Sequence, residues 1–97
     1  MAMFGKAKEQ LDFVKKAREI QKKMKDKTIT TQSGAVTLIM NGEMKIQKIQ
    51  LEKDDIDIEK LDVLEKDIKS AFESGIKQSQ DFGANLMKEI GGIPGLS

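Results

Sequence analysis

The spacing of apolar residues changes twice along the chain, and this limits the fold more than any other feature. Apolar residues recur every three or four positions up to residue 27 and again between residues 61 and 90, while residues 28–51 are rich in Thr, Val, Ile and Leu. Three- and four-residue spacing indicates helix, and β-branched stretches indicate strands. We therefore predict one α+β domain over residues 1–97, with an N-terminal helix, a three-stranded antiparallel sheet and a long C-terminal helix.

The chain offers little material for a hydrophobic core. Its 97 residues include four Phe and no Trp or Tyr, so the core must consist of Leu, Ile, Val and Met. A lone domain of this size buries a modest share of its surface and is marginal in stability. We therefore expect a partner subunit and predict a homodimer.

The first helix, expected within residues 1–27, carries two apolar stripes roughly 110° apart on the helical wheel. The earlier stripe consists of Phe4, Ala7, Leu11 and Val14. The later stripe consists of Phe13, Ala17, Ile20 and Met24. Either both stripes face one broad core, or one packs within the subunit and the other against a partner. The residues predicted for the dimer interface are Phe13, Ala17, Ile20, Met24, Phe82 and Leu86.

Charge is distributed unevenly between the two parts of the chain. Residues 1–27 hold nine basic and four acidic residues, a net charge of +5, whereas residues 28–97 hold eight basic and twelve acidic residues, a net charge of −4. This asymmetry indicates that the first helix faces a polyanion. The basic residues avoid both stripes and form a ridge away from the later one, although a solvated helix face shows the same pattern. The predicted DNA-binding residues are Lys8, Lys15, Lys16, Arg18, Lys22 and Lys23.

Residues 28–51 predict three short strands. The expected strands are Thr28–Gln32, Ala35–Met40 and Glu43–Leu51. Asn41-Gly42 is the strongest hairpin signal in the chain.

Two registers are open for this hairpin. A two-residue turn would pair Leu38 with Lys45 and mix apolar and polar faces. We therefore expect a three-residue loop that pairs Leu38 with Met44 and places Gly42 in the left-handed conformation. The alternation of apolar residues then shifts by one position between Ile46 and Ile49 in the last strand. This shift predicts a bulge near Gln47-Lys48.

Residues 52–60 form an acidic linker. It leads into the second helix near Glu59 or Leu61, with Asp57 as the candidate N-cap. The acidic residues lack the spacing and fixed glycine of a calcium loop, so we interpret them as solvated linker charge. They are Glu52, Asp54, Asp55, Asp57 and Glu59.

The second helix, predicted over residues 61–90, would be about 45 Å long. This is more than a small sheet can cover, so its far half should project or meet a partner. Gly75 and Gly83 lie inside it and either allow close helix approach or permit a bend. Residues 91–97 are expected to form a loose tail.

Composition excludes several kinds of chemistry. The chain has no Cys and no His, which excludes disulfides, thiol nucleophiles, Cys/His zinc sites and His-based acid–base catalysis. No glycine-rich phosphate loop is present. We therefore predict no enzyme activity, no cofactor, no metal site and no small-molecule substrate. No run of about 18 apolar residues occurs, so we expect no membrane span and a cytoplasmic location.

Several segments have a familiar order. Met3-Phe4-Gly5-Lys6 precedes a helix rich in Lys, Gln and Met, and the most specific segment is residues 33–42, with the sequence SGAVTLIMNG. Leu64-Glu65 with Ile68 and Ala71-Phe72 opens the second helix, and Gly91–Leu96 contains the Gly-Gly and Pro-Gly pairs. Together these segments resemble the YbaB/EbfC family of small bacterial nucleoid-associated DNA-binding proteins.

The resemblance implies an α+β subunit that dimerises into a tweezer-like shape. It also implies binding to double-stranded DNA, a role in nucleoid organisation or gene regulation, and a location in the cytoplasm and nucleoid. Because the chain has one Arg and many Lys, we expect contacts mainly with phosphates.

Two other functions remain open. One is a dimeric protein-interaction or adaptor module without DNA binding, in which the Lys face only increases solubility. The other is a basic amphipathic helix lying on a membrane surface. Salt-dependent DNA binding separates the first of these from a DNA-binding protein, and sedimentation with liposomes tests the second.

Overall fold

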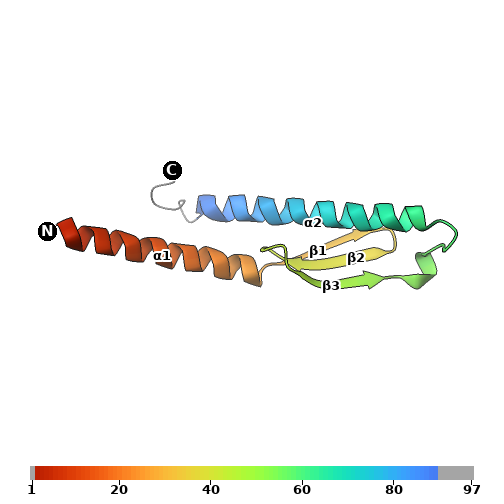
Figure 1. The fold of residues 1–97 in the computed structure, drawn as a ribbon, viewed down its shortest axis with the longest axis horizontal. Coiled ribbons are helices and arrows are strands. Elements are labelled where there is room, and N and C mark those ends of the chain that lie inside the picture. Colours follow the sequence, from red (N-terminus) through yellow and green to blue (C-terminus); the bar gives the residue numbers. More distant parts are fainter. Residues whose placement is uncertain (1, 90–97) are drawn as a thin grey trace.

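The predicted order of a helix, three strands and a long helix is confirmed by the structure (Figure 1). The structure is a computed structural model that describes residues 2–89, with side-chain surroundings from residue 10 onward. The tail predicted at residues 91–97 and the side chains of Phe4, Ala7 and Lys8 lie outside this description. The elements are α1 (Ala2–Asp26), β1 (Thr28–Ser33), β2 (Val36–Asn41), β3 (Ile46–Leu51), a short 3-10 helix η1 (Lys53–Asp55) and α2 (Leu61–Glu89).

The three strands form one antiparallel sheet in the order β1-β2-β3. Helix α2 packs on β1 and β2, and no Cα atom of α2 lies within 8 Å of a Cα atom of β3. Helix α1 and the sheet follow one another along the long axis, and α2 runs beside both (Figure 1). The sheet is therefore covered on one face, and only over two of its strands.

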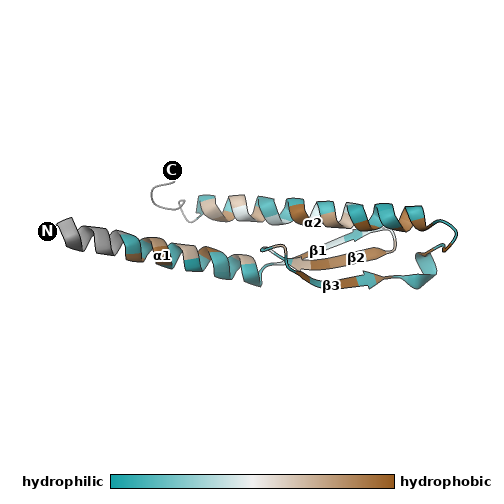
Figure 2. Ribbon diagram, in the orientation of Figure 1, coloured by the Kyte–Doolittle hydropathy of each residue, from teal (hydrophilic) through white to brown (hydrophobic). Residues whose placement is uncertain are grey.

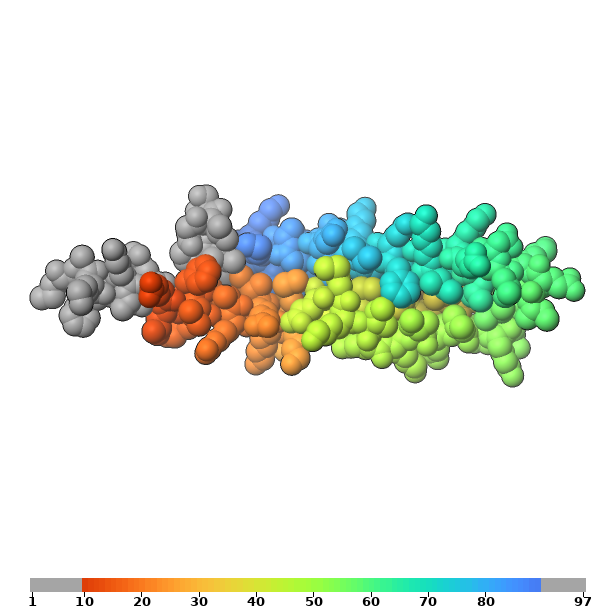
Figure 3. All heavy atoms as spheres, viewed as in Figure 1, coloured from red at the N-terminus to blue at the C-terminus, as the bar shows by residue number. Residues whose placement is uncertain are grey.

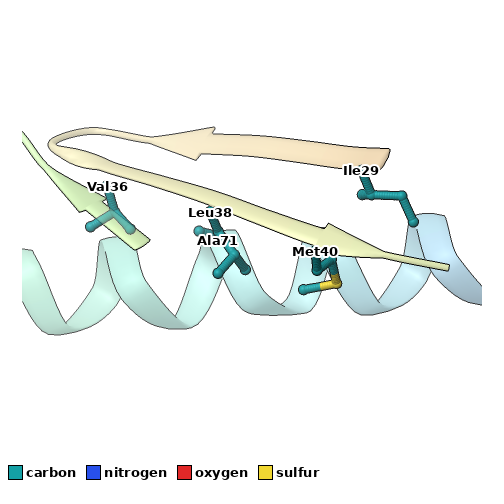
Figure 4. Packing of buried hydrophobic residues seen from close by; sticks show 5 residues of the cluster. All are labelled: Ile29, Val36, Leu38, Met40 and Ala71. Carbon is teal, nitrogen blue, oxygen red and sulfur yellow. The ribbon is translucent and has the colours of Figure 1, made fainter. Parts of the chain in front are cut away.

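The core lies between α2 and the two strands beneath it (Figure 4). Every second residue of β2 points toward the helix, as strand geometry requires. A Cβ atom at Gly75 would lie 2.5 Å from Cε of Met40, so this glycine lets α2 approach the strand β2 closely. The hydroxyl of Thr31 also donates a buried hydrogen bond of 2.8 Å to the carbonyl of Ala71. The core residues are Ile29, Val36, Leu38, Met40 and Ala71.

The register expected for the second hairpin is wrong. Leu38 lies opposite Ile49 and not opposite Met44 or Lys45, so neither short loop occurs. The predicted bulge near Gln47-Lys48 is confirmed, because the pairing between β2 and β3 shifts by one residue at this point. The bulge keeps the apolar residues of β3 on the same face of the sheet as the core.

The loop between β2 and β3 is longer than expected because one side chain organises it. Oδ1 of Asn41 accepts hydrogen bonds from the backbone N–H groups of Glu43 at 2.9 Å and Lys45 at 3.0 Å. An asparagine side chain that binds nearby backbone groups stabilises such a turn. The left-handed residue is Met44, with φ of 63°, and not Gly42 as predicted.

Gly42 instead holds the end of α1 against the rest of the chain. Its N–H donates to the carbonyl of Met24 at 2.7 Å, and its carbonyl accepts a buried hydrogen bond of 2.6 Å from the hydroxyl of Ser79. A Cβ atom at this position would lie 2.6 Å from the carbonyl oxygen of Met24. Only glycine fits here, and α1, the loop and α2 meet at this one residue.

Asp57 does not cap α2 as predicted. The helix begins at Leu61, so its N-cap position is Lys60. Asp57 makes the turn before the helix: Oδ1 accepts from the N–H of Glu59 at 3.0 Å, and its carbonyl accepts from the N–H of Lys60 at 2.9 Å. Asp57 therefore organises a turn that lies four residues before the first residue of the helix.

The molecule is strongly elongated. Its Cα radius of gyration is 19.3 Å, and its extents are 72 × 20 × 16 Å. A compact chain of this length has a radius of gyration of about 13 Å. The far half of α2 meets α1 of the same chain, and α1 extends past the end of α2 (Figures 1 and 3). The projecting element is therefore α1.

We expect Gly42→Ala to destabilise the fold. The added methyl group meets backbone atoms of α1 that cannot rotate away, and overpacking of this kind costs roughly 1–3 kcal/mol. Thermal unfolding monitored by circular dichroism measures the loss. Gly83→Ala is the control, because a Cβ atom there lies 3.4 Å from Cε of Met24, an ordinary contact. Equal melting temperatures for Gly42→Ala and the parent chain would contradict the role given to Gly42.

Candidate nucleic-acid interface

Three of the predicted cationic residues form an exposed row on α1. Lys15, Arg18 and Lys22 are all exposed, and spacings of three, four and seven residues place them on one face of the helix. Lys15 and Lys22 lie about 10 Å apart along the axis. We call Lys15, Arg18 and Lys22 the basic row. It lies on the part of the molecule that extends furthest from the sheet.

The other predicted cations contribute less to this row. Lys16 is half-buried, and Nζ of Lys23 lies 3.4 Å from a carboxylate oxygen of Glu19, one helical turn away. An exposed pair at this spacing is weak, about 0.3–0.5 kcal/mol, so Lys23 can exchange its partner. Lys8 belongs to α1, but its side chain lies outside the described residues.

The sequence had led us to expect that the basic residues avoid both apolar stripes. In the structure, however, the basic row is not separated from the earlier stripe. Lys15 and Arg18 line one shallow hollow together with Gln10, Leu11 and Val14. Leu11 is 57% exposed and Val14 is also exposed. Figure 2 shows brown and tan segments between the teal ones on the coloured part of α1. The face that carries the cations therefore also presents apolar surface.

The later stripe packs, at least in part, within the subunit. Met24 faces α2 at Gly83, and Nζ of Lys27 lies 5.2 Å from the ring centroid of Phe82. Leu86 is 3% exposed and has little surface left for a partner. Of the residues predicted for the dimer interface, Phe13 is exposed, and Ala17, Ile20, Met24 and Phe82 are partly buried. Whether these residues also contact a second copy stays a prediction.

Strand β3 carries an uncovered apolar surface that the sequence pattern did not reveal. Ile46, Ile49 and Leu51 are each 48–50% exposed. They point to the same side of the sheet as Val36 and Leu38, but α2 does not reach over them. We call Ile46, Ile49 and Leu51 the β3 strip. The sequence shows that these residues are apolar, but it does not show that α2 leaves them uncovered.

The described residues show no arrangement for metal chemistry. From residue 10 to residue 89, no three potential acidic ligands come together, and the acidic residues of the linker are exposed. In the same part of the chain, neither helix combines the length and the apolar character needed to cross a membrane.

Comparison with known proteins identifies the family. The sequence model of the YbaB/EbfC DNA-binding family matches residues 1–93. The chain belongs to this family. Two proteins named as nucleoid-associated, from Clostridium kluyveri and Clostridium acetobutylicum, are 28% and 29% identical to it; both alignments cover 87% of this chain, and they cover 78% and 80% of those proteins.

The YbaB/EbfC fold also occurs in a solved structure. An uncharacterized protein from Helicobacter pylori superposes with a TM-score of 0.77, at 24% sequence identity, over 92% of this chain and 97% of its own. Within the YbaB/EbfC chain described here, the basic row lies on the projecting first helix, and the second helix and the sheet form the part that holds it in place.

Proposed function

We propose that this chain binds duplex DNA as a nucleoid-associated protein and that the basic row of α1 contacts the phosphates. The observation that carries the proposal is the exposed row of three cations on the projecting helix of a chain that belongs to a DNA-binding family. The two Clostridium relatives are named as nucleoid-associated proteins, which supports the same role.

Phosphate contact follows from the geometry and the residue types. DNA carries one negative charge per roughly 1.7 Å of helix axis, so cations spaced along a rod can find phosphates in many orientations. Lysine acts as a compact charge on a flexible stem, whereas arginine is the better reader of base edges. Arg18 is the only arginine in the chain. The complex therefore relies on charge and carries little sequence information.

Binding without strong sequence preference suits a protein that covers many sites. Contacts to phosphates position a protein on DNA but do not select a sequence. We propose that the chain acts as a homodimer, so that two basic rows engage DNA together. Linking two weak sites in one particle raises the overall affinity well above that of either site alone. This combination supports a role in nucleoid organisation or in broad gene regulation.

One observation favours a second candidate, a dimeric adaptor module without DNA binding. Leu11 and Val14 are exposed between the cations, and a helix with this mixed face also fits a groove on another protein. In that case the lysines would only keep the helix soluble. DNA binding by the purified chain at low salt separates the two candidates.

We expect Lys15→Glu/Lys22→Glu to weaken DNA binding by roughly tenfold or more, because two phosphate contacts per subunit become repulsive. Fluorescence anisotropy with a labelled duplex at low salt measures the affinity. Lys66→Glu/Lys77→Glu is the matched control: it changes the net charge equally at two exposed lysines of α2. Equal losses in both variants would show that net charge, and not the basic row, governs binding.

The affinity should fall steeply with salt and vary little among unrelated duplexes. The logarithm of the binding constant falls by about 0.9 for each phosphate contact and each tenfold rise in salt. Removing Lys15 and Lys22 should therefore reduce this slope by about 2 for each subunit that contacts DNA. Titrations at several salt concentrations measure it. A parent chain that does not bind any duplex at low salt would support the adaptor module instead.

A further inference from the structure

Leu11 lies at the centre of the charged face of α1. Because a helix turns by about 100° per residue, two cations lie within roughly 40° of Leu11 on either side. They are Lys15 and Lys22 on one side and Arg18 and Lys25 on the other, and all four are exposed. Leu11 itself is 57% exposed. This face of the helix therefore has an apolar centre with cations along both margins.

No acidic residue interrupts this face among residues 10–26, the part of α1 whose side chains are described. The acidic residues of this part lie roughly 60–100° around the helix from Leu11. They are Asp12, Glu19 and Asp26. Val14 lies one turn from Leu11, is 44% exposed and lines the same hollow. The two aliphatic residues therefore form a small apolar surface that is framed by positive charge alone.

This surface lies on the part of α1 that extends past the end of α2 (Figures 1 and 3). Glu19 and Glu89, the last residue of α2, line one hollow, so α2 ends beside Glu19. Leu11 precedes Glu19 by eight residues and lies about 12 Å further out along the axis. The major groove of B-DNA is about 12 Å wide and admits a single α-helix. The width of the molecule at Leu11 therefore suits the groove.

We propose that this face of α1 enters the major groove and that Leu11 and Val14 contact thymine methyl groups. The inference rests on the DNA binding of the proposed function and names the groups that the helix meets. The C5-methyl group of thymine is the apolar group that base pairs present in the major groove. The cations on the two margins then reach phosphates on both sides of the groove. They hold the helix in position, whereas the aliphatic pair contributes affinity where methyl groups are available.

The arrangement of the charges favours DNA over a protein groove or a lipid surface. A helix that binds in a protein groove presents apolar residues at positions i, i+3, i+4 and i+7. Counted from Leu11, positions i+4 and i+7 are Lys15 and Arg18. A helix that lies on a lipid surface needs a broad apolar face, whereas four cations surround the two aliphatic residues here. The two phosphate backbones of a duplex supply negative charge on both sides of a groove.

The contact gives a preference for composition and not for one sequence. A methyl group offers the same apolar surface in any sequence context, so unrelated duplexes with similar A·T content should bind alike. Burial of apolar surface does not release counterions, so it raises the affinity without changing its dependence on salt. The aliphatic pair and the cations therefore make separable contributions to binding.

Replacing thymine by uracil tests the contact without changing any charge, because uracil lacks only the C5-methyl group and keeps the same base pairing. We expect the parent chain to bind an A·T-rich duplex with thymine more tightly than the same duplex with uracil, by roughly fourfold for each methyl group that becomes buried. Fluorescence anisotropy at one fixed salt concentration measures both affinities. Methylating cytosine at C5 in a G·C duplex should raise the affinity in the same way.

The double variant Leu11→Gln/Val14→Gln should bind both duplexes with the same, weaker affinity. Glutamine removes apolar surface, keeps the net charge and favours helix, so the circular dichroism spectrum should not change. The salt dependence should also stay that of the parent chain, because all cations remain. Ile58→Gln/Val63→Gln is the matched control, since these two residues are 81% and 50% exposed outside α1. It should prefer thymine as the parent chain does.

The outcomes separate this contact from DNA binding itself. Equal affinity of the parent chain for the thymine and uracil duplexes would overturn the contact and leave phosphate binding intact. A Leu11→Gln/Val14→Gln variant that still prefers thymine would do the same, as would loss of the preference in both double variants alike. A parent chain that binds neither duplex at low salt would overturn the proposed function together with the contact.

Discussion

The contact at Gly42 fixes how the whole molecule is arranged. Its N–H binds the carbonyl of Met24 at the end of α1, and its carbonyl receives the hydroxyl of Ser79 from the middle of α2. Both groups would otherwise be buried without partners, which costs more than the bonds themselves contribute. Because the backbones of Gly42 and Met24 approach so closely, the direction in which α1 extends from the sheet is fixed. The reach of the basic row depends on this direction.

Uncovered apolar residues lie at two places in the molecule. Leu11 and Val14 share the projecting helix with the basic row, whereas the β3 strip lies on the sheet. A single elongated chain cannot bury all of this apolar surface, since its radius of gyration is about half as large again as that of a compact chain. In the homodimer that we propose, two charged helices are available to a polyanion.

Much of this could be predicted from local patterns. The element order, the bulge near Gln47-Lys48 and the exposed positions of Lys15, Arg18 and Lys22 follow from spacing along the chain, because a helix or strand repeats side-chain directions regularly. The hairpin register could not be predicted in this way. It depends on Asn41, whose side chain binds two backbone groups and lengthens the loop beyond what its neighbour Gly42 indicates.

The sequence by itself determined which residues are apolar, which are charged and which face of each element they share. Only the tertiary structure decided which of those faces is covered. A helix is about 10–12 Å across and strands lie about 4.8 Å apart, so α2 covers β1 and β2 and leaves β3 open. Ile49 and Leu38 share a face and an apolar character, yet one is half exposed and the other fully buried. The width of a single helix, which no sequence pattern records, makes this difference.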